Sequence, residues 1–167
     1  MTNDIEGNGG LRWGVKDSFI DYVRRSGGSV EASEGVEASD DGFVFPRTAD
    51  DAVLDPVSPT GVACFGGRLR FRAHAGHLDV VLGEPEVHFG DHGASLHVHD
   101  LHGDLVELAT LQLGGAFRRD DGALDWVAVP VTLTSAGADT FGGAYPAYTE
   151  FEPLSLSLLP AAGDWRG

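Results

Sequence analysis

A serine, a tyrosine and a histidine in this chain have the chemistry and spacing of a ligand-binding group. Ser18 and Tyr22 are four residues apart in an amphipathic stretch, so on a helix they lie one turn apart and face the same way. Further along, His74 stands where an alternating, strand-like run meets a turn. Tyrosinate is one of the few protein ligands of ferric haem, so a phenol, a hydroxyl and an imidazole brought together could hold an iron porphyrin.

The segments around these residues, and others further along the chain, also contain recognisable sequence motifs. They are LRWGVKDSFIDY (residues 11–22), FVFP (43–46), GRLRFRAHAGHL (67–78), LTSAG (133–137), FGGAY (141–145) and EPLSL (152–156). In this order they resemble the haem-transport-associated (HtaA) domain family, whose members take up haem and pass it on at the surface of certain Gram-positive bacteria. The resemblance spans residues 11 to 158, nearly the whole chain.

The resemblance implies a role for each of the three side chains. The tyrosine at the position of Tyr22 is the family's axial iron ligand, and the histidine at the position of His74 supports it by hydrogen bonding. The serine at the position of Ser18 lies in the haem pocket. A porphyrin needs a flat apolar slot, and we expect Phe19 and Tyr145 to contact it. The implied cofactor is haem b in the ferric state.

Elementary chemistry agrees with a tyrosinate ligand. A free tyrosine has a pKa of about 10, so its phenolate is a minor species at neutral pH. Ferric iron stabilises the anion, and a neighbouring imidazole that accepts the proton lowers the cost of ionisation. A hard anionic oxygen prefers the higher iron charge, so we expect reduction to weaken binding.

Composition and charge set outer limits on function. The chain has 167 residues, which predicts a single domain, and no apolar run approaches the roughly 20 residues that span a membrane. A net charge of −15 argues against binding to nucleic acid or anionic lipid. Haem propionates would still need local positive charge. The candidates, which the sequence does not rank, are Arg12, Lys16, Arg24, Arg25 and Arg47.

The ends of the chain bear on its location. Residues 1–10 have neither the basic nor the apolar region of a signal peptide, and the single Cys64 excludes an internal disulfide. Family members are usually exported, whereas these features predict a cytoplasmic protein, with a domain taken from a longer chain as the alternative. We expect residues 1–10 to form a disordered tail, residues 11–160 the single haem-binding domain, and residues 161–167 a second tail.

The periodicity of the chain predicts a mainly β fold. One helix is expected over residues 15–26, ended by Gly27-Gly28, and no other helical signal is found. The acidic stretch 31–41 is expected to be a solvated loop. The remaining pattern indicates an antiparallel β-sandwich or barrel-like domain. Its strands are expected over residues 42–45, 69–73, 78–82, 86–89, 94–100, 104–111, 123–133 and 154–159.

A second group of histidines lies in the middle of the chain. It consists of His88, His92, His97, His99 and His102. Imidazoles this close can bind zinc, nickel or copper, but there is no cysteine or carboxylate at recurrent spacing beside them. We interpret the group as the solvent-exposed face of a hairpin, with a metal site or a second haem contact as the alternative.

The sequence leaves three classes of function open. The favoured hypothesis is a haem carrier for uptake, trafficking or buffering, with no enzymatic activity, which exchanges haem with a donor or acceptor protein. Whether it acts as a monomer or a homodimer stays open. A weak peroxidase-like haem enzyme would need a distal acid–base residue, which the sequence does not identify. The third hypothesis is a β-domain that binds only protein partners. No hydrolase or phosphate-loop motif competes with these.

Overall fold

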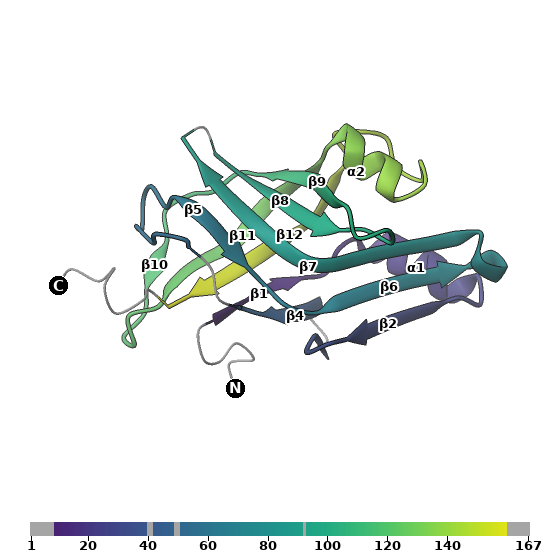
Figure 1. Cartoon of the computed structure of the whole chain (residues 1–167), viewed down its shortest axis with the longest axis horizontal. Helices are drawn as coiled ribbons and strands as arrows, with labels where there is room; N and C mark the ends of the chain where they lie inside the picture. The colour runs from purple at the N-terminus through teal and green to yellow at the C-terminus, as the bar shows by residue number, and fades with distance from the viewer. Residues whose placement is uncertain (1–8, 40–41, 49–50, 92, 160–167) are drawn as a thin grey trace.

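The computed structural model describes residues 9–39, 42–48, 51–91 and 93–159 (Figure 1). Its strands are β1 (Gly9–Trp13), β2 (Ser29–Ser33), β3 (Glu37–Ser39), β4 (Gly42–Pro46), β5 (Gly61–Cys64), β6 (Arg68–Ala73), β7 (Leu78–Gly90), β8 (Gly93–His99), β9 (Leu105–Leu111), β10 (Phe117–Arg118), β11 (Leu124–Leu133) and β12 (Glu150–Leu158). The helices are α1 (Asp17–Arg25), α2 (Ser135–Thr140) and the short 3₁₀ helix η1 (His74–Gly76).

All strands within the described residues belong to one antiparallel sheet. Its order is β2-β6-β7-β8-β9-β11-β12-β1-β4-β3, with β5 added to β7 and β10 added to β11. The sheet curls back on itself, so that β7 and β8 lie in front of β11, β12 and β1 (Figure 1). An isolated bridge between Arg47 and Phe65 connects the ends of β4 and β5. The predicted mainly β, antiparallel domain with a short N-terminal helix is therefore confirmed.

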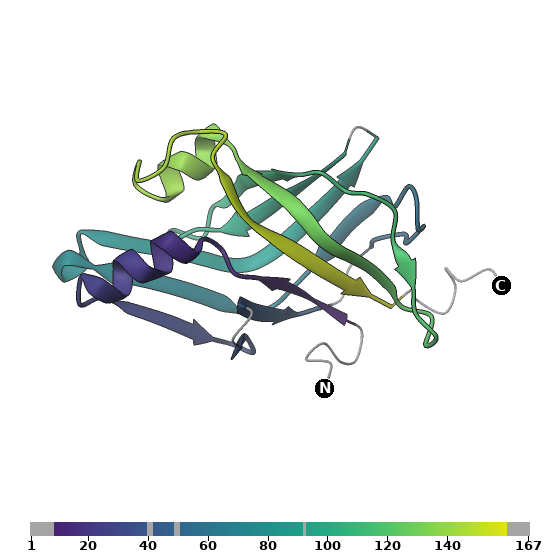
Figure 2. The same ribbon diagram turned by 180° about the vertical axis from the view of Figure 1, so that it is seen from behind.

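The core lies between the two halves of the curled sheet. Strand β12 shows the pattern that builds it, because its leucines at 154, 156 and 158 are buried in the core, while Ser155 between them is half-buried and Ser157 is covered by the Arg119 side chain. Strand β6 alternates in the same way, with Leu69 and Phe71 fully buried and arginines between them. Helix α1 adds Phe19 and Val23 to this core. It lies across the end of β6 and β2, with α2 above it (Figure 2).

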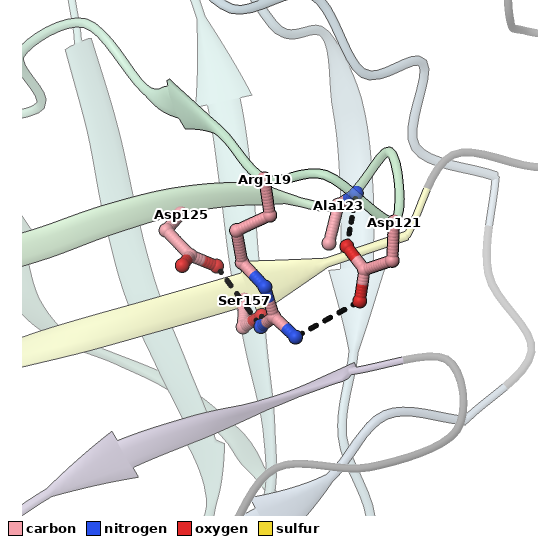
Figure 3. Close-up of polar contacts among 5 residues, drawn as sticks. All are labelled: Arg119, Asp121, Ala123, Asp125 and Ser157. Carbon is pink, nitrogen blue, oxygen red and sulfur yellow. Dashed lines mark hydrogen bonds and ion pairs between the residues drawn. The ribbon is translucent and has the colours of Figure 1, made fainter. Parts of the chain in front are cut away.

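A polar cluster holds the β10–β11 hairpin against β12 (Figure 3). The Arg119 guanidinium donates to the Ser157 hydroxyl at 2.9 Å and to the Asp121 carboxylate at 2.9 Å, and it lies 3.6 Å from Asp125. Asp121 also accepts from the Ala123 backbone N–H at 3.0 Å. Ser157 is the buried polar residue of this cluster, and the arginine gives its hydroxyl a partner.

Several predicted boundaries were wrong. Gly9 and Gly10, assigned to a tail, form β1 by pairing with β12, while residues 1–8 and 160–167 lie outside the described residues. The stretch 31–41, predicted as a loop, carries part of β2 and all of β3. Both strands expose most of their side chains, so pairing with β6 and β4 forms them without a hydrophobic alternation. Asp40 and Asp41 lie outside the described residues.

Other elements departed from the prediction in ways that the local sequence explains. The strands expected at 78–82 and 86–89 are one strand, β7, with an irregular register between Gly83 and Glu86. The short strands β5 and β10 were not predicted, and neither was α2. Helix α2 begins because the Thr134 side chain accepts from the Gly137 backbone N–H at 2.9 Å, an N-cap for an otherwise weak helix-forming segment. No described helix is long and apolar enough to cross a membrane.

Candidate functional site

The C-terminal end of α1 fixes the helix against β6. Gly27 has φ of +75°, a conformation that glycine adopts without strain. Its N–H donates to the Arg24 carbonyl at 3.1 Å, and the Gly28 N–H donates to the Val23 carbonyl at 2.9 Å, which closes the helix end as a Schellman motif. A Cβ on Gly28 would lie 2.0 Å from the Arg72 carbonyl oxygen. Glycine at this position therefore lets the helix end touch the backbone of β6.

Phe19 anchors the middle of α1 from inside. Its side chain is 1% exposed. Its ring meets those of Phe71 and Phe141 edge-on, each at 5.2 Å between centroids, and that of Tyr145 at 6.4 Å. These rings come from β6, from the end of α2 and from the loop that leads to β12. One buried aromatic therefore holds together the segments that carry the other predicted site residues.

The His74 imidazole meets the Tyr22 phenol at the end of β6. His74 and Ala75 have φ of +55° and +56°, a left-handed conformation that is unusual for residues other than glycine, and Gly76 follows with φ of +90°. This turn places the imidazole beside α1. The Tyr22 hydroxyl and His74 Nε2 lie 2.5 Å apart, a short hydrogen bond between side chains 52 positions apart in the sequence.

A second hydrogen bond continues along the same side of α1. The Ser18 hydroxyl and the Tyr145 hydroxyl lie 2.7 Å apart. Tyr145 belongs to the loop after α2, in which Gly142 and Gly143 have φ of +68° and +78°. The structure thus brings together all of the predicted site residues, through the contacts Tyr22–His74, Ser18–Tyr145 and Phe19–Tyr145.

The polar groups of this site face solvent. Tyr22 is 48% exposed, the most exposed large apolar side chain of α1, while Phe19 beneath it is buried. Ser18 and His74 are also exposed. An accessible phenol whose hydroxyl already contacts an imidazole can pass its proton to that imidazole and present an anionic oxygen to a metal. The donor set therefore fits ferric iron of a haem.

Basic side chains lie on and near α1 and β6. Lys16 donates to the Glu150 carbonyl at 3.0 Å, and Arg25 lies 3.8 Å from Asp21. Arg72, which the sequence analysis did not single out, lies on β6 two residues before His74. The alternating arginines of RLRFRA were the available signal, because alternation on a strand places them together on its outer face.

The second histidine group does not converge on a common point. The rings of His88 and His97 stack at 3.9 Å, and His88 Nε2 lies 2.9 Å from the Glu86 carboxylate. Burial, followed by the neighbouring His88, lowers the pKa of His97 below its ordinary value. His99 Nδ1 lies 3.2 Å from the Glu84 carbonyl. Over the described part of the chain, no three His, Cys, Asp or Glu side chains are arranged to hold a metal ion.

The remaining histidines of the group add little to this picture. The backbone N–H of His102, rather than its ring, donates to the Asp100 carboxylate at 2.9 Å, and His92 lies outside the described residues. His88, His97 and His99 have intermediate burial, which agrees with their interpretation as a solvent-exposed strand face.

Comparison with known proteins places this geometry in context. The HtaA family model, described as Htaa, matches residues 8–157. The N-terminal domain of HtaA from Corynebacterium glutamicum is similar in structure, with a TM-score of 0.78, 23% sequence identity, and coverage of 95% of this chain and 99% of that chain. The C-terminal domain of the same protein has a TM-score of 0.73 at 24% identity, covering 90% of this chain and 94% of that chain.

A third solved structure extends the comparison. The heme binding protein HtaB from Corynebacterium glutamicum has a TM-score of 0.70 at 19% identity, covering 92% of this chain and 93% of that chain. Among curated proteins, a search by sequence finds no match. At these identities the solved structures show a shared fold.

Proposed function

This chain belongs to the HtaA family, and from that premise we propose that it is a haem-binding carrier whose Tyr22 phenolate is the axial ligand of ferric iron. The observation that carries the proposal is the 2.5 Å hydrogen bond between the Tyr22 hydroxyl and His74 Nε2. A solvent-accessible tyrosine whose hydroxyl is hydrogen-bonded to an imidazole has a proton acceptor in place when its oxygen binds a metal. The heme binding protein HtaB, which shares the fold, supports the same class of ligand.

Each residue of the site has a separate role in haem binding. His74 holds the Tyr22 hydroxyl through the hydrogen bond and would accept its proton when the oxygen binds iron. Bound haem b supplies a Lewis-acidic ferric centre for that oxygen. Phe19 and Tyr145 support the helix from below and from the side, and Ser18 fixes the Tyr145 hydroxyl at 2.7 Å.

The proposal is for a carrier in haem uptake, trafficking or buffering rather than an enzyme. The polar groups of the site lie at the surface, where haem can be received from, and passed to, a second protein without a large rearrangement. An anionic oxygen ligand favours ferric over ferrous iron, so reduction is expected to weaken binding and assist release.

The chain offers a matched control for testing the ligand. It contains three tyrosines, of which Tyr148 is 76% exposed and has no place in the site. We expect haemin to bind the wild type saturably at one equivalent with a Soret band. Tyr22→Phe should weaken binding by about a hundredfold or more, His74→Ala by about tenfold, and Tyr148→Phe by nothing measurable. Equal affinity of the wild type and Tyr22→Phe would contradict the proposed ligand.

A further inference from the structure

The antiparallel ladder opens on one side of β11 and leaves a groove there. Pairing with the β9 side ends where the Gln112 N–H donates to the Pro130 carbonyl at 3.1 Å, and it resumes only at β10. Between these points β11 is irregular, because Ala128 has φ of +55° and the register against β12 shifts. The opposite chain passes through Gly114 and Gly115, where an added Cβ would meet nothing within 4 Å. The resulting groove has a volume of about 410 Å³.

The walls of this groove expose large apolar side chains. Phe117 is 69% exposed and Val127 is 63% exposed, whereas most large apolar residues that the structure describes are buried in the core. Leu113, which also lines the groove, is partly buried. Among the described residues of the lining none is acidic or basic, although the chain has a net charge of −15. Exposed apolar surface gathered in one place is typical of an interaction site.

The chain leaves the sheet close to this groove. Strand β12 ends at Leu158, opposite the first residue of β11, and the C-terminal segment (residues 160–167) follows. Val127 is the fourth residue of β11. At about 3.3 Å per residue and 4.8 Å between strands, it lies roughly 14 Å from Leu159. Six residues lead from Leu159 to Trp165, and an extended chain of that length spans about 20 Å. The Trp165 indole can therefore reach the groove.

The end of β12 and the groove also share one face of the sheet. Ser157 alternates with the buried leucines of β12, so it points away from the core, and the Arg119 guanidinium contacts it there (Figure 3). Arg119 contacts Asp125 on the same face. Phe117 lies directly opposite Asp125 in the ladder, and residues so paired project from the same face. This face lies toward β10, at the end of the molecule away from α1 (Figure 1).

We infer that the C-terminal segment folds back over β11 and places the Trp165 indole in this groove. Asp164 and Arg166 flank the indole and balance each other, so the segment brings no net side-chain charge to an uncharged groove. Because the segment is attached to β12, docking is intramolecular, and the apolar contact of one aromatic side chain is sufficient. A second copy of the chain would instead bring another net charge of −15 to the same face.

The inference goes beyond the proposed function, because the contact involves neither Tyr22 nor bound haem. It assigns the apolar surface at this end of the molecule to the chain's own segment. The groove then becomes available to another protein only when the segment is displaced.

Tryptophan fluorescence of the full chain without added haemin tests the contact. The chain has three tryptophans, and the other two, Trp13 and Trp126, are 2% and 1% exposed. Subtracting the emission of a Trp165→Phe protein therefore isolates the Trp165 signal. Its quenching by acrylamide, which is uncharged, is compared with that of N-acetyltryptophanamide in solution.

Two variants with the same added charge probe the groove. Val127→Asp places a carboxylate in its wall, whereas Leu105→Asp places one at the start of β9, outside the lining, where the leucine is 46% exposed. Each is measured against its own Trp165→Phe background. Circular dichroism checks that the fold is kept, and sedimentation velocity gives the oligomeric state of each sample.

We expect a monomeric wild type in which Trp165 emits at shorter wavelength than the free amide and is quenched at least about twofold less. Val127→Asp should raise the quenching of Trp165 by about twofold or more, because docking would bury a carboxylate, and Leu105→Asp should match the wild type. Quenching of Trp165 in the wild type equal to that of the free amide, or equal quenching in the two variants, would overturn the inference. Shielding that occurs only in a dimer, and that is lost when Val127→Asp dissociates it, would also overturn it and assign the groove to a second copy.

Discussion

Replacing Gly28 with alanine is expected to push the C-terminal end of α1 away from β6. An alanine Cβ would lie 2.0 Å from the Arg72 carbonyl oxygen, 2.9 Å from the Val23 carbonyl oxygen and 3.0 Å from the Ala73 Cβ. The nearest of these is backbone, which cannot rotate aside as a flexible side chain would. The helix end itself must therefore move.

The size of the effect follows from these distances. Ordinary contacts between carbon and carbonyl oxygen begin at about 3.3 Å, so the helix end must shift by roughly 1.3 Å. Overpacking of this kind costs about 1–3 kcal/mol in free energy of unfolding. The same shift would stretch the 2.5 Å contact between Tyr22 and His74 beyond the range of a good hydrogen bond. Haemin affinity should fall together with stability.

Gly27→Ala provides the comparison. An added Cβ there meets nothing within 4 Å, so the cost comes from the positive φ of +75° alone, about 1 kcal/mol. Urea unfolding followed by circular dichroism, with a haemin titration of each variant, separates the two effects. Gly28→Ala should lose both stability and haemin affinity, whereas Gly27→Ala should lose stability only. Wild-type affinity in Gly28→Ala would refute the idea that this close approach positions Tyr22.

Two further predictions concern regions outside the site. Arg119→Met should lower the free energy of unfolding by about 1–3 kcal/mol, because it removes the guanidinium that contacts the Asp125 carboxylate and the buried Ser157 hydroxyl. An unchanged urea midpoint would show that the cluster does not hold the hairpin. The pKa of His97 is lowered mainly by burial, so the unfolded chain binds its proton more readily than the folded protein. Stability should therefore fall as the pH drops through about 6.5 toward the lower folded pKa. His97→Phe should flatten that slope, and identical slopes would contradict the assignment.

The parts of the fold that the sequence predicts are those with a strong local pattern. The alternation in β6 and β12 and the amphipathic stretch of α1 each reflect one buried and one exposed face, so periodicity locates them. Strands β2 and β3 lack that signal because most of their side chains are exposed. They exist through pairing with distant strands, which local sequence does not encode.

The same distinction applies to the site. Tyr22 and His74 were identified from sequence motifs and side-chain chemistry, and the structure places them in contact. The Ser18–Tyr145 hydrogen bond joins residues 127 positions apart, and spacing along the chain could not predict it.

The identity of the iron's axial ligand is the central claim, and resonance Raman spectroscopy of the ferric haem complex tests it most directly. Excitation into the tyrosinate-to-iron charge-transfer band should enhance phenolate ring vibrations in the wild type and in Tyr148→Phe, and these vibrations should be absent from Tyr22→Phe. Phenolate vibrations that persist in Tyr22→Phe, or a wild-type spectrum with only histidine ligation, would contradict the account.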